Sequence, residues 1–268
     1  MNRMDVYAHF LHPLKTCRWA KKQIGQFEAS EKAFFKDNPG KEFSYVEFVT
    51  TQWVHGVEFS VRPTDELEEQ AYRAVGDLRN SLDQAIYAAC KSLGVDDPKR
   101  ANVPIGDGKK HFERQLASTG GPYRDIPVAL HPKISGFMPY PPETENAEGN
   151  SLLRALAEMA NPNKHHLPLG VEVQTGMKFY GSSGGVISVG TKWDWKGRTE
   201  LYRRIPGVPY EIKMELEPRI AFGQVAGMAG KPVSRTLREM LPMVECIIGD
   251  LKTETNWLLA GGHRAFAR

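Results

Sequence analysis

Four polar residues in the middle of a helical stretch are the residues of this chain best suited to chemistry. They fall in the run Leu78 to Gln84, where Arg79, Asn80, Asp83 and Gln84 lie among the apolar positions of the helix. Arg79 and Asp83 are one helical turn apart and border the apolar stripe. A guanidinium and a carboxylate at the edge of a core are costly unless they are paired. The spacing therefore predicts either a structural ion pair or a site.

A carboxylate on an earlier helix, Glu31, belongs to the same cluster. It occupies a position where the period of a helix over 15–36 favours an apolar residue. If the two helices pack together, we expect Glu31 to reach Arg79 while Asp83 pairs with the same guanidinium. Buried networks of this kind usually fix the register of helices. Glu31, Asp83 and Gln84 are therefore interpreted as a structural polar cluster.

A second group of candidate residues is the segment Lys164-His165-His166, which follows Asn161-Pro162. The proline predicts the end of a helix, so these residues are expected on a loop, where functional groups are commonly presented. Histidine is the usual acid–base residue near neutral pH, which makes His165 a candidate catalyst. A metal site needs three or four ligands, and two adjacent histidines do not supply them. The structural alternative is a histidine that caps the preceding helix or pairs with a backbone carbonyl.

The elements that must position these residues are predicted from apolar periodicity. Long helices are expected near 15–36, 64–93, 151–160 and 233–259, a β-hairpin at 43–61 and an antiparallel sheet over 171–224. The glycine-rich run 181–185 is expected to be the loop of a hairpin. The order of the elements indicates a single α+β domain over 1–268, in which 1–170 is mainly helical, 171–230 forms the sheet and 231–268 is a returning helix.

The composition is that of a soluble globular protein. Charged residues make up 25% of the 268 positions, apolar residues 41%, and the net charge is +3. We identify neither a signal peptide nor an apolar run long enough to cross a bilayer, so no membrane association and a cytoplasmic location are expected. The three cysteines lack the spacing of a metal site, and Cys90 and Cys246 are predicted to be buried. No metal and no cofactor are expected.

Short motifs along the first 170 residues resemble a group of uncharacterised bacterial and phage proteins. The matching stretches are Leu78 to Gln84, Val103-Pro104-Ile105, Met138-Pro139-Tyr140 and Asn163 to His166. The helix with Arg79-Asn80 is in turn similar to the signature of the HEPN superfamily of helical nucleotide-binding and ribonuclease domains. That signature has an arginine and a polar residue followed, after a short gap, by a histidine. Gln84 stands at the histidine position of this chain.

The resemblance implies a protein that binds RNA or cleaves it without a metal, as a homodimer formed through the long helices. Arg79, Asn80 and His165 would be catalytic, and Lys164 and His166 would bind the substrate. Gln84 departs from the pattern because an amide does not shuttle a proton. Either the protein does not cleave RNA, or another base such as His165 replaces the missing histidine.

Two other functions fit the same sequence. The first is a non-catalytic interaction protein, for example an antitoxin-like factor, that binds a protein partner through the sheet. Aromatic residues of the kind enriched at interfaces favour it, and they are Tyr180, Trp193, Trp195, Tyr202 and Tyr210. The second is a small-molecule enzyme that uses the histidine pair.

Overall fold

The computed structural model describes residues 3–59, 61–142, 148–163, 170–193, 198–223 and 227–262. The predicted α+β class is confirmed. The chain forms two compact units, each built from separate stretches of sequence. The helical unit comprises Met1–Gly25, Gln70–Leu169 and Arg235–Arg268, and the β unit comprises Gln26–Glu69 and Gly170–Ser234. The single domain expected over 1–268 stays a prediction.

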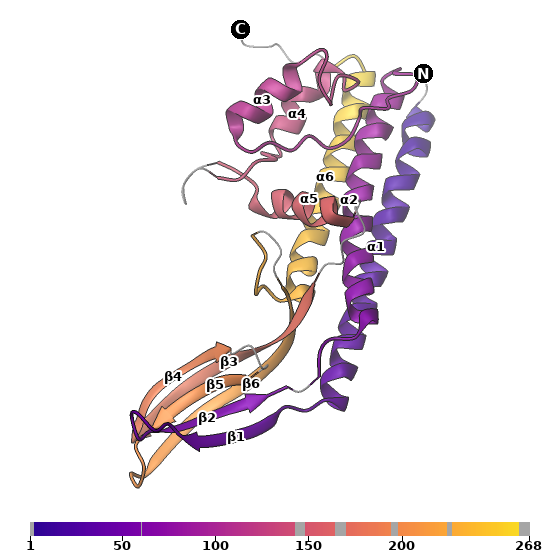
Figure 1. Ribbon diagram of the computed structural model, residues 1–268. Helices are drawn as coiled ribbons and strands as arrows, with labels where there is room; N and C mark the ends of the chain where they lie inside the picture. The colour runs from indigo at the N-terminus through magenta and orange to yellow at the C-terminus, as the bar shows by residue number, and fades with distance from the viewer. Residues whose placement is uncertain are drawn as a thin grey trace. The chain divides into compact units, whose positions relative to one another are not determined.

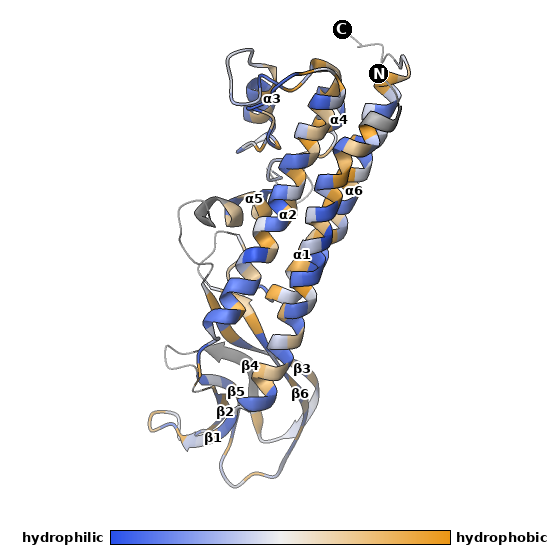
Figure 2. Ribbon diagram, turned by 90° about the vertical axis from the view of Figure 1, so that its right-hand side faces the viewer, coloured by the Kyte–Doolittle hydropathy of each residue, from blue (hydrophilic) through white to orange (hydrophobic). Residues whose placement is uncertain are grey.

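Three long helices form the core of the helical unit and lie side by side there (Figure 1). They are α1 (Arg3–Asp37), α2 (Asp65–Ser92) and α6 (Val233–Leu259). Apolar and polar residues alternate along α2 and α6 with a helical period, as Figure 2 shows by colour. The fully buried side chains include Leu78 and Leu82 of α2 and Val244 and Leu251 of α6. The predictions for 64–93 and 233–259 are confirmed.

The first helix begins earlier than predicted. It runs through Pro13, which has no backbone N–H and disfavours a helix interior. Phe10 and Val6, one and two turns ahead of Pro13, are fully buried and continue the apolar stripe of Ala20 and Ile24. Packing of that face outweighs the local preference of the proline.

Shorter helices cover the long ones in the helical unit. They are α3 (Lys109–Ala117), the 3-10 turn η1 (Val128–Leu130), α4 (His131–Ser135) and α5 (Ser151–Asn163). Each contributes at least one buried apolar side chain, among them Phe112, Leu130, Ile134 and Leu156. The irregular segment after α2 is therefore packed against the rest of the helical unit.

Two antiparallel sheets form the β unit. The first has the order β1-β2-β5-β4, from β1 (Lys41–Val46), β2 (Trp53–Glu58), β5 (Arg198–Arg204) and β4 (Val186–Trp193). The second pairs β3 (Val171–Gly184) with β6 (Tyr210–Phe222). Val57, Leu201 and Tyr202 of the first sheet pack with Ile212, Met214 and Leu216 of β6. The predicted hairpin at 43–61 is confirmed by the β1–β2 pairing.

The prediction of a hairpin around 181–185 is wrong, because the chain changes sheets there. β3 pairs with β6 as far as Gly184, whereas β4 pairs with β5. Gly185 lies between the layers, since its N–H donates to the carbonyl of Pro209 and its own carbonyl accepts from Ile205. Gly184 has φ +73°, and a Cβ there would overlap the Pro209 carbonyl. The glycines allow a crossover rather than a hairpin turn.

None of the described helices combines the length and the apolar composition needed to cross a membrane.

Candidate functional site

Arg79 and Asp83 form an ion pair that also holds the backbone of a neighbouring loop. The guanidinium Nη2 lies 3.0 Å from Asp83 Oδ1 and donates to the carbonyl of Val103 at 3.0 Å. The same Asp83 oxygen accepts from the Val103 N–H at 2.8 Å. Arg79 is only 8% exposed. The predicted pairing of Arg79 with Asp83 is thus present, and it clamps both backbone polar groups of Val103.

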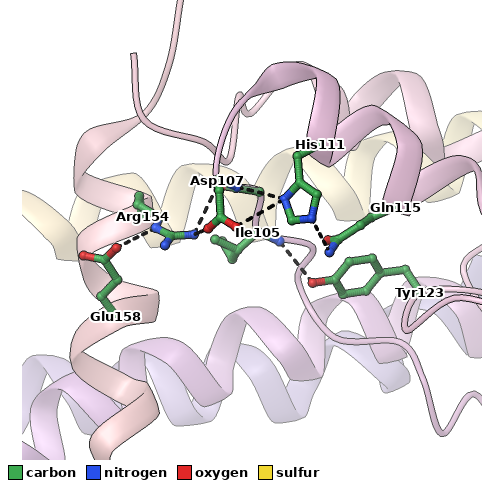
Figure 3. Close-up of polar contacts among 8 residues, drawn as sticks. Ile105, Asp107, His111, Gln115, Tyr123, Arg154 and Glu158 are labelled. Atoms are coloured by element: carbon green, nitrogen blue, oxygen red, sulfur yellow. Dashed lines mark hydrogen bonds and ion pairs between the residues drawn. The ribbon is translucent and has the colours of Figure 1, made fainter. Parts of the chain in front are cut away.

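The remainder of that loop is fixed by a second polar cluster, on α3 and α5 (Figure 3). Arg154 of α5 lies 2.9 Å from Asp107 Oδ1 and 2.7 Å from Glu158 Oε1, and it donates to the carbonyl of Gly106. His111 Nδ1 accepts from the N–H of Asp107 at 3.2 Å. His111 Nε2 lies 3.0 Å from the amide nitrogen of Gln115. Both ring nitrogens are engaged inside the protein, so this cluster positions the loop rather than a substrate.

A cavity of about 470 Å³ opens beside the buried guanidinium, which we call the Arg79 cavity. Its volume is within the range of about 300–1,000 Å³ that small-molecule sites occupy. The Nη1 of Arg79 is buried and has no hydrogen-bond partner in the described part of the chain. Trp19 of α1 is 51% exposed at this cavity. The lining residues are Trp19, Gln23, Tyr72, Arg73, Gly76, Asp77, Arg79, Asn80 and Ala160.

The charges around the Arg79 cavity are mixed. Burial raises the pKa of Asp77, and the nearby Arg73 opposes that shift. Lys15 Nζ lies 5.0 Å from the centre of the Trp19 ring, which is within range of a cation–π interaction. Asn80, exposed on α2, adds an amide to the lining. The cavity therefore offers cations, an amide and an exposed aromatic ring, which suit a ligand with an anionic group and a planar ring.

A second cavity, of about 500 Å³, lies further along the same two helices and is called the Gln84 cavity. Gln84 Oε1 accepts from the hydroxyl of the buried Thr16 at 2.8 Å. Two histidines of α1 line this cavity, and His9 Nδ1 lies 2.9 Å from Ser92 Oγ. The complete lining is Ala8, His9, His12, Pro13, Gln84, Tyr87, Ala88 and Lys91.

Sequence reasoning did not place His9 and His12 beside Gln84, where both line the cavity. Their spacing of three residues places both side chains on one face of a helix. That signal depends on α1 beginning at Arg3, whereas the sequence analysis begins the helix at residue 15. The structure brings these histidines, rather than a histidine of α2, to the cavity of Gln84.

Glu31 has partners in the β unit. Its Oε1 accepts from the N–H of Ile220 at 2.7 Å. Burial raises the pKa of Glu31, while hydrogen bonds from Ile220 and Ser234 oppose the shift. The expected contact with Arg79 is replaced by a link between the end of α1 and β6. Sequence periodicity identified an unusual carboxylate, but the strand that satisfies it is distant in sequence.

Several predicted site residues have no described side-chain geometry. Lys164, His165 and His166 lie outside the described residues, as does Trp195, and the side chain of Trp193 is not described either. The last described turn of α5 contributes Ala160 to the Arg79 cavity. The structure therefore places Arg79 and Asn80 together in that cavity and Gln84 in the next one.

The aromatic residues expected to form a recognition surface divide into two groups. Tyr180 is exposed. Tyr202 is buried and stacks on His55, with ring centres 4.6 Å apart. The guanidinium carbon of Arg204 lies 4.6 Å from the centre of the Tyr210 ring. Burial and Arg204 lower the pKa of His55. These stacked residues stabilise one end of the two sheets.

Comparison with known proteins gives no relative: no family model, no curated protein and no solved structure matches the chain. Within the described ranges, no three His, Cys, Asp or Glu side chains gather in a group suited to a metal ion.

Proposed function

We propose that the helical unit binds single-stranded RNA along the line of contact between α1 and α2. The observation that carries the proposal is the buried Nη1 of Arg79, unpaired among the described residues, beside the exposed ring of Trp19. A buried donor without a partner costs about 1–3 kcal/mol. The guanidinium that carries this donor lines the Arg79 cavity, where its charge attracts a phosphate group. A base stacked on an exposed aromatic ring contributes about 1–3 kcal/mol.

The arrangement of the two cavities supports an extended ligand. On α1, Trp19 and Gln23 line the Arg79 cavity, and His12, two turns before Trp19, lines the Gln84 cavity. On α2 the linings run from Tyr72 through Asn80 to Lys91. With a rise of about 1.5 Å per residue, these linings extend over roughly 28 Å of α2. Aromatic rings and cations that alternate along a groove are typical of single-strand binding.

The resemblance to HEPN domains adds cleavage to this proposal. Under the cleavage hypothesis, Arg79 stabilises the charge that develops on the phosphate, and Asn80 orients the scissile group. The proton transfers need a titratable group, which Gln84 does not provide. The two histidines to test are His12, which lines the Gln84 cavity, and His165, which the sequence analysis predicts to be catalytic.

The binding test uses the complete chain and a fluorescently labelled single-stranded RNA oligonucleotide in an anisotropy titration. Trp19→Ala is expected to weaken binding by about 5–150-fold, the equivalent of one stacked base. Trp257→Ala is the matched control, because Trp257 is a partly exposed tryptophan of α6 outside both cavity linings. Affinity should fall as salt rises. Equal affinity of the wild type, Trp19→Ala and Asn80→Ala would overturn the proposal.

The cleavage test follows the length of the same RNA with and without EDTA. Loss of intact RNA that survives EDTA and disappears in Arg79→Ala and in His165→Ala or His12→Ala supports the nuclease assignment. Binding with no loss of RNA removes cleavage and leaves the binding proposal standing. A parallel titration with single-stranded DNA of the same sequence measures whether the 2′-hydroxyl contributes.

A further inference from the structure

Among the described residues, strand β1 is an exposed edge of the four-stranded sheet in the β unit (Figure 1). It pairs with β2 over six residues without a shift in register. Every residue of β1 except Phe43 is exposed. The opposite edge, β4, has two register shifts against β5, and such irregularities discourage further pairing. β1 is therefore the regular edge that can accept another strand.

The direction of the β1 amides follows from the turn that joins it to β2. The N–H of Glu47 donates to the carbonyl of Gln52, and the carbonyl of Glu47 accepts from Thr51. In an antiparallel pair, inward and outward backbone groups alternate along the strand. Since Glu47 points toward β2, the backbone groups of Glu42, Ser44 and Val46 point outward.

We propose that β1 pairs antiparallel with β1 of a second copy of this chain, in a register centred on Ser44. The two-fold axis then relates Ser44 to itself, and the outward groups of Glu42 meet those of Val46. This register gives full pairing of the three outward residues. It joins two four-stranded sheets into one continuous sheet.

The side chains of β1 are complementary to themselves in this register. Lys41 lies opposite Glu47, the residue after β1, of the second copy. The Glu47 carboxylate lies 2.6 Å from Arg203 of its own chain, so Lys41 adds a second cation to it, twice by symmetry. Phe43 lies opposite Tyr45 of the second copy in a non-hydrogen-bonded pair, where side chains are closest. Aromatic and opposite-charge cross-strand pairs stabilise sheets. Within one chain Phe43 and Tyr45 already stack, with ring centres 6.2 Å apart.

The hairpin tip supplies an apolar anchor for the same pairing. Phe48 and Val49 are 95% and 88% exposed. Continued beyond β1, the register brings the turn residue Phe48 near Gly40 of the second copy. Gly40 lines a cavity of about 240 Å³, together with Pro39, Phe59 and Val61. A Cβ at Gly40 would overlap the side chains of Val57 and Phe59, so these side chains pack directly against the Gly40 backbone and form the apolar surface that an incoming ring would meet. Buried aromatic anchors of this kind dominate interface energies.

The first test is site-directed disulfide formation. Ser44→Cys brings two thiols to the two-fold axis, where paired Cα atoms are about 5.5 Å apart and a disulfide forms without strain. Glu42→Cys is the matched control, because the axis separates the two copies of position 42 by four residues, about 14 Å. Both substitutions are made in a Cys246→Ser background, since Cys246 is exposed. Rapid cross-linking of Ser44→Cys alone supports the register. Equal cross-linking of both variants, or none, overturns it.

The second test measures association by sedimentation velocity over a range of concentrations. The wild type is expected to reach twice the 30.1 kDa chain mass. Ser44→Pro removes one outward N–H per copy and leaves the β2 bonds intact, so it should weaken association at least tenfold, whereas Ser44→Ala should not. Phe48→Ser should also weaken association without changing the melting temperature. A wild-type monomer at all concentrations overturns the proposal. A dimer unaffected by Ser44→Pro and Phe48→Ser also overturns it, and would indicate another interface such as the long helices.

Discussion

Replacement of Asp83 by alanine tests whether the Arg79–Asp83 pair is a structural clamp. The substitution removes the carboxylate 3.0 Å from the guanidinium and the acceptor 2.8 Å from the Val103 N–H. It leaves a guanidinium that is 8% exposed without its counter-charge. Breaking a buried ion pair from one side costs about 3–5 kcal/mol. With a urea slope of about 3 kcal/mol/M, the unfolding midpoint should fall by about 1–1.7 M.

Arg79→Ala should cost less than Asp83→Ala. It removes the buried charge itself and leaves Asp83 with its hydrogen bond from Val103. The main loss is the partner of the Val103 carbonyl, which corresponds to about 1–3 kcal/mol. The double variant contains neither charge, so its cost should be smaller than the sum of the two single costs by about 0.5–3 kcal/mol.

Urea unfolding followed by far-UV circular dichroism gives the three free energies, and exchange of the Val103 amide hydrogen reports the clamp locally. Two results would refute the reasoning. One is a cost of Asp83→Ala below about 1 kcal/mol, the value of an exposed pair. The other is additivity of the single variants within about 0.5 kcal/mol. Either result would show that the Arg79–Asp83 pair contributes little to stability, and would favour ligand binding as the main role of Arg79.

Three further predictions concern titratable side chains. Burial raises the pKa of Glu31, so its contribution to stability is complete below the ordinary carboxyl pKa and declines as pH rises through the raised value. Glu31→Gln should accordingly unfold at a higher temperature than the wild type at pH 7, and the difference should vanish in acid; a constant difference would contradict this. Burial also raises the pKa of Asp77, so RNA affinity should rise as pH falls and Asp77→Asn should tighten binding at pH 7 in the anisotropy titration. An unchanged pH profile in that variant would contradict the assignment. Burial raises the pKa of Cys17 to about 11 and of Cys90 to about 12, whereas Cys246 is exposed. A colorimetric thiol reagent should therefore modify one cysteine of the folded chain and all three after denaturation; rapid reaction of a second thiol in the folded state would count against it.

Sequence periodicity predicts the helices that bury one continuous apolar face. The 3.6-residue period locates α2 and α6 within a residue at each end, because one continuous apolar face is buried in each. The same period identified Glu31 as unusual. It did not identify the Ile220 amide, since that partner comes from a strand distant in the sequence.

Other features depend on tertiary context that a single sequence does not encode locally. The first helix was expected to begin near residue 15, but the buried Val6 and Phe10 extend α1 past Pro13 and bring His9 and His12 to the Gln84 cavity. Cys246 was expected in the core of α6 and is exposed, because its neighbour Ile247 takes the buried position. The glycine run at 181–185 suits a hairpin and a crossover equally well, and only the pairing of β3 with β6 decides between them.

The division of the chain into interleaved segments has a consequence for its folding during synthesis. The helical unit requires the segment from Arg235 onward, and the β unit requires the segment from Gly170 to Ser234. Neither unit can be complete when the first half of the chain leaves the ribosome. Contacts between segments so far apart slow folding and leave apolar surface exposed in the meantime. The helical unit therefore cannot complete its apolar core until α6 has been synthesised.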